Sequence, residues 1–325
     1  MQDTNRNIRL PEFVSLDVTY RCNLRCVHCY NNSGERELCE LGRDELIGTA
    51  WQIVELQPFN LCICGGEPLC CPWLEDVLSI FKGRIPRINM VTNGYAMTEK
   101  LAGKLREYGV SAVQISLDGA YAWQHDTLRG VPGAFERALN ALSLLKNAGF
   151  SQLYTSILPT VLNTGSLEEY IRLCLSVGVS RVRSMPFLAA GRGSGVGRAL
   201  MLDDAGYFYY KRELARLRRL YGEQIVIEWD DPLANIILPE RGMPKNISLF
   251  ADGSIAASVY LPVTLGNTRR HTLSEYWFGG YCGAWNAPRL KEYISPLTNL
   301  SGLDELAPPP HGGGRIELDI LEDRP

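Results

Sequence analysis

LDVTYRCNLRCVHCYN, residues 16–31, is the stretch on which the interpretation of the whole sequence depends. It holds three cysteines, Cys22, Cys26 and Cys29, in the spacing C-x3-C-x2-C. An apolar alternation typical of a β-strand, residues 13–18, precedes the first cysteine. Cysteine thiolates are the protein ligands of iron–sulfur clusters. Three of them on one loop predict a [4Fe–4S] cluster whose fourth iron has no protein ligand and is open to a small molecule.

A structural zinc site is the main alternative. Such a site usually has four protein ligands, often two C-x2-C pairs or a mixture of cysteine and histidine. His28 adjoins Cys29, so its use as a fourth ligand would strain the site. Cysteines further along the chain form no second pair at a suitable spacing: Cys62, Cys64, Cys70, Cys71, Cys174 and Cys282. The residues therefore favour a cluster over zinc.

The pattern C-x3-C-x-aromatic-C after a first strand resembles the signature of the radical S-adenosylmethionine (radical SAM) superfamily, with His28 at the aromatic position. The resemblance extends over residues 13–200. It implies that Cys22, Cys26 and Cys29 hold a [4Fe–4S] cluster and that the open iron binds S-adenosylmethionine (SAM). His28 would pack near the adenine. An electron from the cluster would then cleave SAM to a 5′-deoxyadenosyl radical, since these cofactors supply radical chemistry.

Composition excludes several other classes of protein. The chain has 325 residues, 46% of them hydrophobic, so one large domain with a smaller appendage is expected. The net charge of −3 gives no electrostatic reason to expect nucleic-acid binding. No apolar run reaches membrane-spanning length, and the N-terminus lacks an apolar signal core. We therefore expect a cytoplasmic protein whose ten cysteines are thiols or metal ligands.

Strand-like and helix-like segments alternate six times, as in units with parallel strands and right-handed crossovers. The expected strands are residues 13–19, 60–64, 88–92, 112–117, 154–158 and 179–185. The expected helices are residues 43–55, 72–81, 98–109, 133–147, 166–176 and 203–221. This α/β pattern resembles the superfamily fold, a partial (β/α)6 barrel of the TIM type. Active residues would then lie at the carboxyl ends of the strands.

Glycine-rich turns follow the second and third expected strands. Gly65-Gly66-Glu67-Pro68 comes directly after residues 60–64, and glycines let the backbone approach a ligand closely. By resemblance, Gly65, Gly66 and Glu67 would hold the amino group of SAM. Without that context the same residues are a tight turn. Thr92-Asn93-Gly94 also resembles a superfamily motif and is equally consistent with a simple turn.

Ser116-Leu117-Asp118-Gly119 ends the fourth expected strand, and HDTLRG, residues 125–130, follows it. The pair is typical of the superfamily branch that contains peptide maturases and sulfatase activators. By resemblance, Ser116 and Arg129 would hold the SAM carboxylate, because an arginine fork suits a carboxylate. Asp118 would lie near the ribose or the substrate. His125 is expected to be structural, because a catalytic histidine needs a placed partner.

Later positions add further candidates. Asn163 after the fifth strand and Arg192 after the sixth are candidates for cofactor binding, although Gly191-Arg192-Gly193 is otherwise a solvent-exposed turn. Arg183 and Lys211 are candidates for binding a substrate carboxylate, on charge alone. The sequence leaves open whether Arg183 points into the barrel.

The sequence changes character from Lys245 onward, and we expect residues 1–222 to form the barrel and residues 223–325 an extension. Asp252-Gly253 between apolar runs predicts a hairpin. The segment resembles the SPASM or twitch extension of peptide-maturing relatives, which carries cysteines for auxiliary clusters. Only Cys282 follows Trp277 here, and one thiol cannot hold a cluster. We therefore expect no auxiliary cluster. The proline and glycine run 308–314 predicts a linker and a loose C-terminus.

Without an auxiliary cluster to accept an electron, a redox-neutral reaction is expected. The chain length and the cysteine-poor extension resemble the cytosylglucuronate decarboxylases of nucleoside-antibiotic pathways. This implies loss of the sugar carboxylate from a cytosine–glucuronic acid conjugate, a small molecule. The expected partner protein is an electron donor such as flavodoxin or ferredoxin, and neither nucleic acid nor a membrane is expected.

Two alternatives stay open at this point. One is a peptide maturase or epimerase, for which Cys282 is the candidate hydrogen donor. The short stretch before the first strand leaves no room for a winged-helix leader-peptide module, which lowers the expectation of a peptide substrate. The other alternative is a non-catalytic iron–sulfur sensor or scaffold, which would not need the Gly-Gly-Glu-Pro motif.

Overall fold

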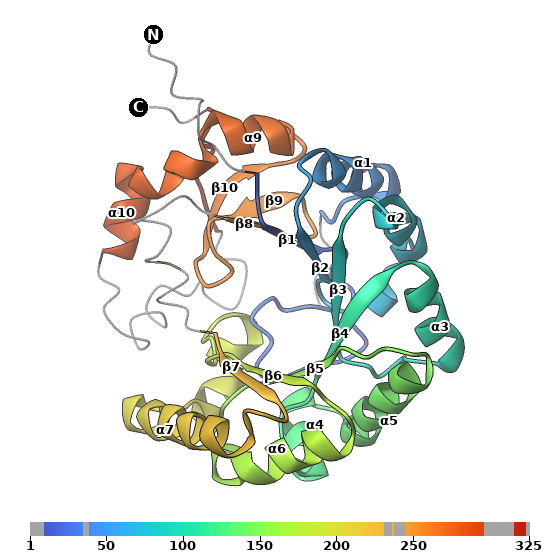
Figure 1. Cartoon of the computed structure of the whole chain (residues 1–325). Coiled ribbons are helices and arrows are strands. Elements are labelled where there is room, and N and C mark those ends of the chain that lie inside the picture. Colours follow the sequence, from blue (N-terminus) through green and yellow to red (C-terminus); the bar gives the residue numbers. More distant parts are fainter. Residues whose placement is uncertain (1–9, 35–38, 231–235, 237–244, 296–314, 323–325) are drawn as a thin grey trace.

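Eleven strands of the described residues form one continuous sheet, which curves into an open barrel with helices on its outside (Figure 1). The computed structural model describes residues 10–34, 39–230, 236, 245–295 and 315–322. The strand order is β11-β10-β9-β8-β1-β2-β3-β4-β5-β6-β7. Strands β1 to β7 are parallel to their neighbours, so successive strand–helix units wind in one direction around the barrel. The partial barrel expected from the sequence is confirmed.

All six expected strand–helix units are present, with small shifts at their ends. Their strands are β1 (Phe13–Asp17), β2 (Asn60–Cys64), β3 (Arg87–Thr92), β4 (Val110–Ser116), β5 (Leu153–Ile157) and β6 (Arg181–Ser184). Their helices are α1 (Arg43–Glu55), α2 (Leu74–Phe81), α3 (Glu99–Glu107), α5 (Ala134–Asn147), α6 (Leu167–Ser176) and α7 (Asp204–Tyr221). Side chains that accept a backbone N–H cap α3 at Thr98 and α7 at Asp203. None of the described helices combines the length and apolar composition needed to cross a membrane.

Two elements of the barrel were not expected from the sequence. Helix α4 (Ala122–Arg129) lies between β4 and α5 and ends at Gly130, whose left-handed backbone (φ 72°) is the usual glycine helix ending. Strand β7 (Val226–Trp229) adds a seventh parallel strand beside β6. Helix α4 buries the polar Gln124 and His125 beside Leu128, and only Ile227 is buried in β7, so neither segment has a clear apolar pattern.

Each barrel strand has an outward face in the core and an inward face toward the barrel interior. On β1, Val14 and Leu16 are fully buried in the core, whereas Ser15 and Asp17 line an interior cavity. The inward residues of the next strands are Cys62, Cys64, Val91, Gln114, Ser116, Ser156 and Arg183. Because side chains alternate with a period of two, each strand supplies both the core and the cavity wall.

The extension continues the same sheet beyond β1. Strand β8 (Asn246–Leu249) pairs in parallel with β1, and it forms the expected hairpin with β9 (Ser254–Ala256) around Asp252-Gly253. The sheet then continues through β10 (Val263–Asn267), and helices α9 (Leu273–Gly279) and α10 (Pro288–Ile294) flank the 3-10 helix η5 (Tyr281–Asn286). The division at residue 222 stays a prediction.

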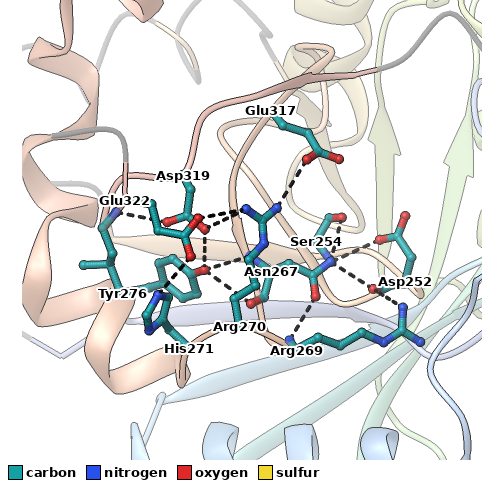
Figure 2. A network of polar contacts seen from close by, with 11 residues as sticks. Asp252, Ser254, Asn267, Arg269, Arg270, His271, Tyr276, Glu317, Asp319 and Glu322 are labelled. Atoms are coloured by element: carbon teal, nitrogen blue, oxygen red, sulfur yellow. Dashed lines mark hydrogen bonds and ion pairs between the residues drawn. The ribbon is translucent and has the colours of Figure 1, made fainter.

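Residues 315–322 dock on the extension, so the expectation of a loose C-terminus is wrong for this segment. Strand β11 (Ile316–Glu317) pairs with β10, and Leu318 and Asp319 after it are buried. The Arg270 guanidinium lies among three carboxylates of this segment (Figure 2), those of Glu317, Asp319 and Glu322. The predicted linker, residues 308–314, lies outside the described residues.

Candidate functional site

A cavity of about 430 Å³ reaches from the barrel interior to the loops that follow the strands. Strands β1 to β6 supply one part of its wall, and β8 with the connection from β9 to β10 supplies another. Most of the predicted site residues line it: Cys22, Cys26, His28, Cys29, Gly65, Gly66, Glu67, Ser116, Asp118, Arg129, Arg183 and Arg192. The structure therefore brings these residues together, while their individual roles stay predictions.

The three cysteine sulfurs each have a donor contact that suits a thiolate. One backbone N–H donates to Cys22 Sγ at 3.5 Å and another to Cys29 Sγ at 3.4 Å. Arg129 Nη1 lies 3.7 Å from Cys26 Sγ. Burial raises the pKa of the Cys22 thiol to about 12 and also raises that of Cys26, where the Arg129 charge opposes the rise. Coordination to a metal deprotonates a thiol even where burial has raised its pKa. The donor contacts would then stabilise the resulting thiolates.

The Gly65-Gly66 turn holds the cysteine loop by close backbone contact. The N–H of Gly66 donates to Thr19 O and that of Glu67 donates to Arg21 O, each at 2.8 Å. A Cβ on Gly66 would lie 2.3 Å from Arg21 O, and Gly65 has a φ of 133°. Both glycines are therefore required by contacts within the chain, apart from any role in binding SAM.

The loop after β6 holds the cysteine loop from another side. In the 3-10 helix η3 (Gly191–Ser194), the backbone N–H of Arg192 donates to Cys29 O at 3.0 Å and its Nε donates to Cys26 O at 2.9 Å. A Cβ on Gly191 would lie 2.5 Å from Cys29 O. The segment is buried, so the alternative of a solvent-exposed turn is wrong. Arg192 fixes the loop that carries the cysteines.

Asp118 and Arg129 form a buried ion pair beside the cysteine loop. The Nη2–Oδ2 distance is 2.6 Å, and the side chains are 2% and 11% exposed. Burial alone would raise the pKa of Asp118, but Arg129 and two nearby histidines hold it below the usual range. Burial disfavours the charge of Arg129, yet Asp118 and Cys26 keep its pKa raised. The pair therefore places a permanent positive charge next to Cys26.

Two histidines lie against Asp118. The backbone N–H of Asp118 donates to Nδ1 of buried His125 at 3.0 Å, a structural contact. His28 Nε2 lies 3.9 Å from Asp118 Oδ2, and its Nδ1 is buried with no hydrogen-bond partner among the described residues. Burial lowers the pKa of each histidine to about 4, so both are neutral at pH 7.

Glu67 is buried, and the protein already engages its carboxylate. Oε1 accepts from the Thr92 hydroxyl and the Leu69 N–H, and Oε2 accepts from the Asn93 N–H at 2.7 Å. These contacts use three of the roughly four acceptor positions of a carboxylate. The Thr92-Asn93-Gly94 turn therefore fixes Glu67, and one acceptor position is left for an ammonium group.

Asn163 and Lys211 do not line the cavity. Asn163 is buried and donates from Nδ2 to two backbone carbonyls at 2.8 Å, one of them that of Asp118. It positions the end of β4 without facing a ligand. Lys211 on α7 lies with Nζ 5.1 Å from the centre of a Trp229 ring. The backbone of Cys282 belongs to η5, and its side chain lies outside the described residues.

Arg183 points into the cavity, which answers the question that the sequence left open. Its Nη2 lies 2.9 Å from Asp230 Oδ2, which also accepts from the Tyr260 hydroxyl at 3.0 Å. Burial opposes the charge of Arg183, but Asp230 keeps its pKa raised. Arg183 therefore lines the cavity as a guanidinium paired with Asp230, and its role in binding a substrate stays a prediction.

Asp17, Cys62 and Cys64 line the cavity although sequence reasoning did not select them. Asp17 is 6% exposed, and its Oδ2 is buried without a hydrogen-bond partner in the described part of the chain. Burial raises the pKa of Asp17 to about 6. The sequence does contain a signal for these residues. They occupy alternate positions of two otherwise apolar strands, and alternate positions share one face of a sheet.

The donor set fits an iron–sulfur cluster better than a single metal ion. Among the described residues, no group of three or more His, Cys, Asp or Glu side chains is arranged to hold one ion. A mononuclear zinc site would need such a group, whereas cluster cysteines bind different irons and stand farther apart. His28 Nδ1, Arg129 Nε and Asp17 Oδ2 are buried without hydrogen-bond partners in these residues, and all three side chains line the cavity. The site therefore fits a cluster together with polar ligands.

Comparison with known proteins agrees with this geometry. The model of the Radical SAM superfamily matches residues 16–175. Mycofactocin maturase MftC of Mycolicibacterium smegmatis is 33% identical over 196 residues, which cover 60% of this chain and 50% of that protein. The AdoMet-dependent heme synthase of Methanosarcina barkeri is 31% identical over 185 residues, which cover 56% and 52%. The chain spans about half the length of these curated relatives.

The fold also matches a solved structure over most of its length. SuiB of Streptococcus suis, in a crystal structure with bound S-adenosylmethionine, has a TM-score of 0.71 and 12% sequence identity. The match covers 91% of this chain and 72% of SuiB. At this identity the likeness concerns the fold alone. Because the match covers 91% of this chain, it includes most of the extension as well as the barrel.

Proposed function

Residues 16–175 of this chain belong to the radical SAM superfamily, whose members use a [4Fe–4S] cluster and SAM, and from that premise we propose that the chain is an enzyme acting on a polar substrate inside the barrel. The observation that carries the proposal is the composition of the cavity wall. The cavity joins the three-cysteine loop, the residues predicted to hold SAM and a polar inner wall. A sensor or scaffold would not need that wall.

When bound, the cluster and SAM would supply radical chemistry, which would begin with removal of a hydrogen atom from the substrate. The protein residues bind and orient. Cys22, Cys26 and Cys29 hold the cluster, and the Arg129 charge stabilises the thiolate form of Cys26. Glu67 offers its remaining acceptor position to the SAM amino group. Ser116 and the unpartnered Arg129 Nε offer hydrogen-bond donors to the SAM carboxylate.

The relatives support a peptide substrate better than a glucuronic-acid nucleoside. The mycofactocin maturase is the more similar of the two curated relatives named above, and SuiB shares both barrel and extension. Another structure of SuiB contains its precursor peptide SuiA. We therefore propose a peptide side chain or terminus as the first substrate class to test.

Decarboxylation of a glucuronic-acid nucleoside is the second candidate, because Arg183 faces the cavity. A guanidinium group that lines a cavity of about 430 Å³ suits a small substrate with a carboxylate. The heme synthase relative also indicates that similar barrels serve substrates other than peptides.

The test is an anaerobic turnover assay with protein reconstituted with iron and sulfide. A one-electron reductant of the flavodoxin type and SAM are added, and 5′-deoxyadenosine is measured by mass spectrometry. Cytosylglucuronic acid and a library of short synthetic peptides are supplied in separate reactions. SAM-dependent loss of CO2 from the conjugate supports the decarboxylase, and a mass change in a peptide supports the maturase.

Matched variants separate chemistry from folding. Cys22→Ala should abolish deoxyadenosine formation, whereas Cys174→Ala should retain it, because Cys174 is buried on α6 outside the cavity. Deoxyadenosine formation by the Cys22→Ala protein would refute the cluster assignment. Failure of the wild-type protein to bind SAM would refute the enzyme proposal and favour a scaffold.

A further inference from the structure

We propose that Asp17 is a substrate-recognition residue, whose unpaired carboxylate oxygen accepts a hydrogen bond from an amino or hydroxyl group of the substrate on the β1–β8 side of the cavity. The inference rests on the proposed function, since it names what that enzyme would bind. It selects polar substrates that present such a donor and excludes purely apolar ones.

The position of Asp17 makes it part of the cavity wall. It is the last residue of β1 and shares the inward face with Ser15, and its register partner on β2 is Cys64. The side chain is 6% exposed, and Oδ2 has no hydrogen-bond partner in the described residues. The Cys64 thiol beside it lowers the pKa of Asp17, although burial raises that pKa by more. Oδ2 of Asp17, a lining residue, is therefore a buried acceptor that a ligand could use.

The neighbouring charged groups do not satisfy that acceptor. Arg315 and Asp252 act on Asp17 from the extension, and they pair with each other at 3.2 Å. Tyr20 and Tyr30 of the cysteine loop and Cys62 and Cys64 of β2 are the other titratable groups around it. Leaving a buried polar atom unpaired is costly, so such an atom in a cavity indicates a ligand donor.

The surroundings assign Asp17 to the substrate rather than to SAM. The charged groups that act on Asp17 are Arg315 and Asp252 of the extension. Its strand β1 also pairs with β8, the first strand of the extension. Ser15 and Ser248, which face each other across β1 and β8 at 3.0 Å, continue the same polar wall. Two hydroxyls and a carboxyl group on one wall suit a substrate with several polar groups.

Direct binding measurements test the proposal without requiring turnover. Holoprotein saturated with SAM is titrated calorimetrically with four probes: cytidine, uridine, glucuronic acid and trialanine amide. The variants are Asp17→Asn and Asp17→Ala, and the control is Asp76→Asn, a surface residue paired with Arg43. We expect at least one probe to bind wild type and to lose roughly tenfold or more in affinity in both Asp17 variants, and not in the control.

The pH profile gives a readout that a purely structural role would not move. In wild type the affinity should rise with pH through about 6, because the ionised carboxylate is the better acceptor, and in Asp17→Asn it should be flat. Cytidine binding without uridine binding would identify an amino donor, and equal binding a hydroxyl donor. Binding of none of the probes by wild type, equal losses in the control, or weakened SAM binding in the Asp17 variants would overturn the proposal. Absence of SAM cleavage by wild type would instead refute the proposed function.

Discussion

The cysteine loop (Thr19–Gly34) and the C-terminal segment (315–322) are both held against the barrel, but by different kinds of contact. Backbone groups of the turns after β2 and β6 donate to backbone carbonyls of the cysteine loop, and glycines allow the close approach. The C-terminal segment is held by β11 and by exposed ion pairs, with Arg270 at their centre (Figure 2). The cysteine loop is therefore held by close backbone contacts that exclude a Cβ. The C-terminal segment combines strand pairing, the buried Leu318 and Asp319, and the ion pairs of Arg270.

The difference shows what each region requires. Three cysteines must keep fixed spacing to hold a cluster, and backbone contacts that leave no room for a Cβ give that precision regardless of salt. Exposed ion pairs are weak and are screened by salt, so they attach a segment without fixing it rigidly. A mutation that displaces the cysteine loop should therefore abolish cluster loading. A mutation in the C-terminal segment should only loosen that segment.

The largest effect is expected for Gly66→Ala. The new Cβ would lie 2.3 Å from the carbonyl oxygen of Arg21, which is backbone and cannot turn away. The loop must move, and we expect a loss of about 4 kcal/mol or more in stability together with loss of cluster loading. Iron and sulfide per chain after reconstitution, with urea unfolding, measure both effects.

Gly48→Ala is the matched control, because a Cβ at Gly48 on α1 meets no atom within 4 Å. Alanine is the better helix former, so this variant should be as stable as wild type or slightly more stable. Normal iron content in Gly66→Ala would show that the cysteine loop tolerates displacement, and the comparison above would fail.

Asp118→Asn should have the next largest effect. The substitution keeps the shape but removes the charge that Arg129 faces at 2.6 Å, and it leaves a buried arginine without its carboxylate. Breaking a buried pair from one side costs about 3 kcal/mol. Urea unfolding measures the loss, and Asp44→Asn, with its exposed side chain on α1, is the control. Equal stability of the two variants would show that the buried pair contributes no more than a surface one.

Much of the barrel was predictable because its signals are local and repeated. Cys22, Cys26 and Cys29 sit at a spacing that few sites require, and the six units show clear periodicity. The sequence also indicated which ends of the strands carry the site. In contrast, α4 and β7 lack a clear apolar pattern, because α4 buries polar residues and β7 has one buried residue. The docking of residues 315–322 depends on a pairing with β10 that sequence order does not reveal.

Individual contacts were harder to predict than the location of the site. Arg129 lines the cavity as expected, but the sequence did not indicate its ion pair with Asp118. Asn163, also expected to face a ligand, instead donates to the backbone carbonyl of Asp118. Charge alone suggested Lys211, but helix α7 directs it to Trp229. Asp17 was missed because its importance lies in burial without a partner, which only the packed structure reveals.

Asp17→Asn is expected to stabilise the protein at neutral pH. Burial raises the pKa of Asp17 from 3.8 to about 6, so ionisation of the folded state costs stability. This loss of folding stability is absent below about pH 4. It grows between about pH 4 and pH 6 and reaches its full size above about pH 6. The amide avoids it, giving a gain of about 3 kcal/mol at pH 8 that shrinks toward pH 5.

Urea unfolding of cluster-loaded protein at several pH values between 5 and 8 measures this gain. Asp76→Asn on the surface of α2 should show no comparable pH-dependent gain, because its partner Arg43 is exposed with it. A gain in Asp17→Asn that does not change with pH would contradict the assignment of the cost to ionisation.

Arg270→Ala should have the smallest effect and should act locally. Its side chain is 39% exposed, and its contacts with Glu317, Asp319 and Glu322 are 3.2 to 3.4 Å long. We expect a loss of about 1 kcal/mol that fades at high salt. Asp319 keeps its hydrogen bond from the Tyr276 hydroxyl at 2.8 Å, so the segment should loosen without detaching. Hydrogen exchange of residues 315–322 at low and high salt measures this, with exposed Arg289→Ala on α10 as the control. Faster exchange in the cysteine loop as well would mean that the two attachments are coupled, whereas exchange confined to the C-terminal segment would confirm that they are independent.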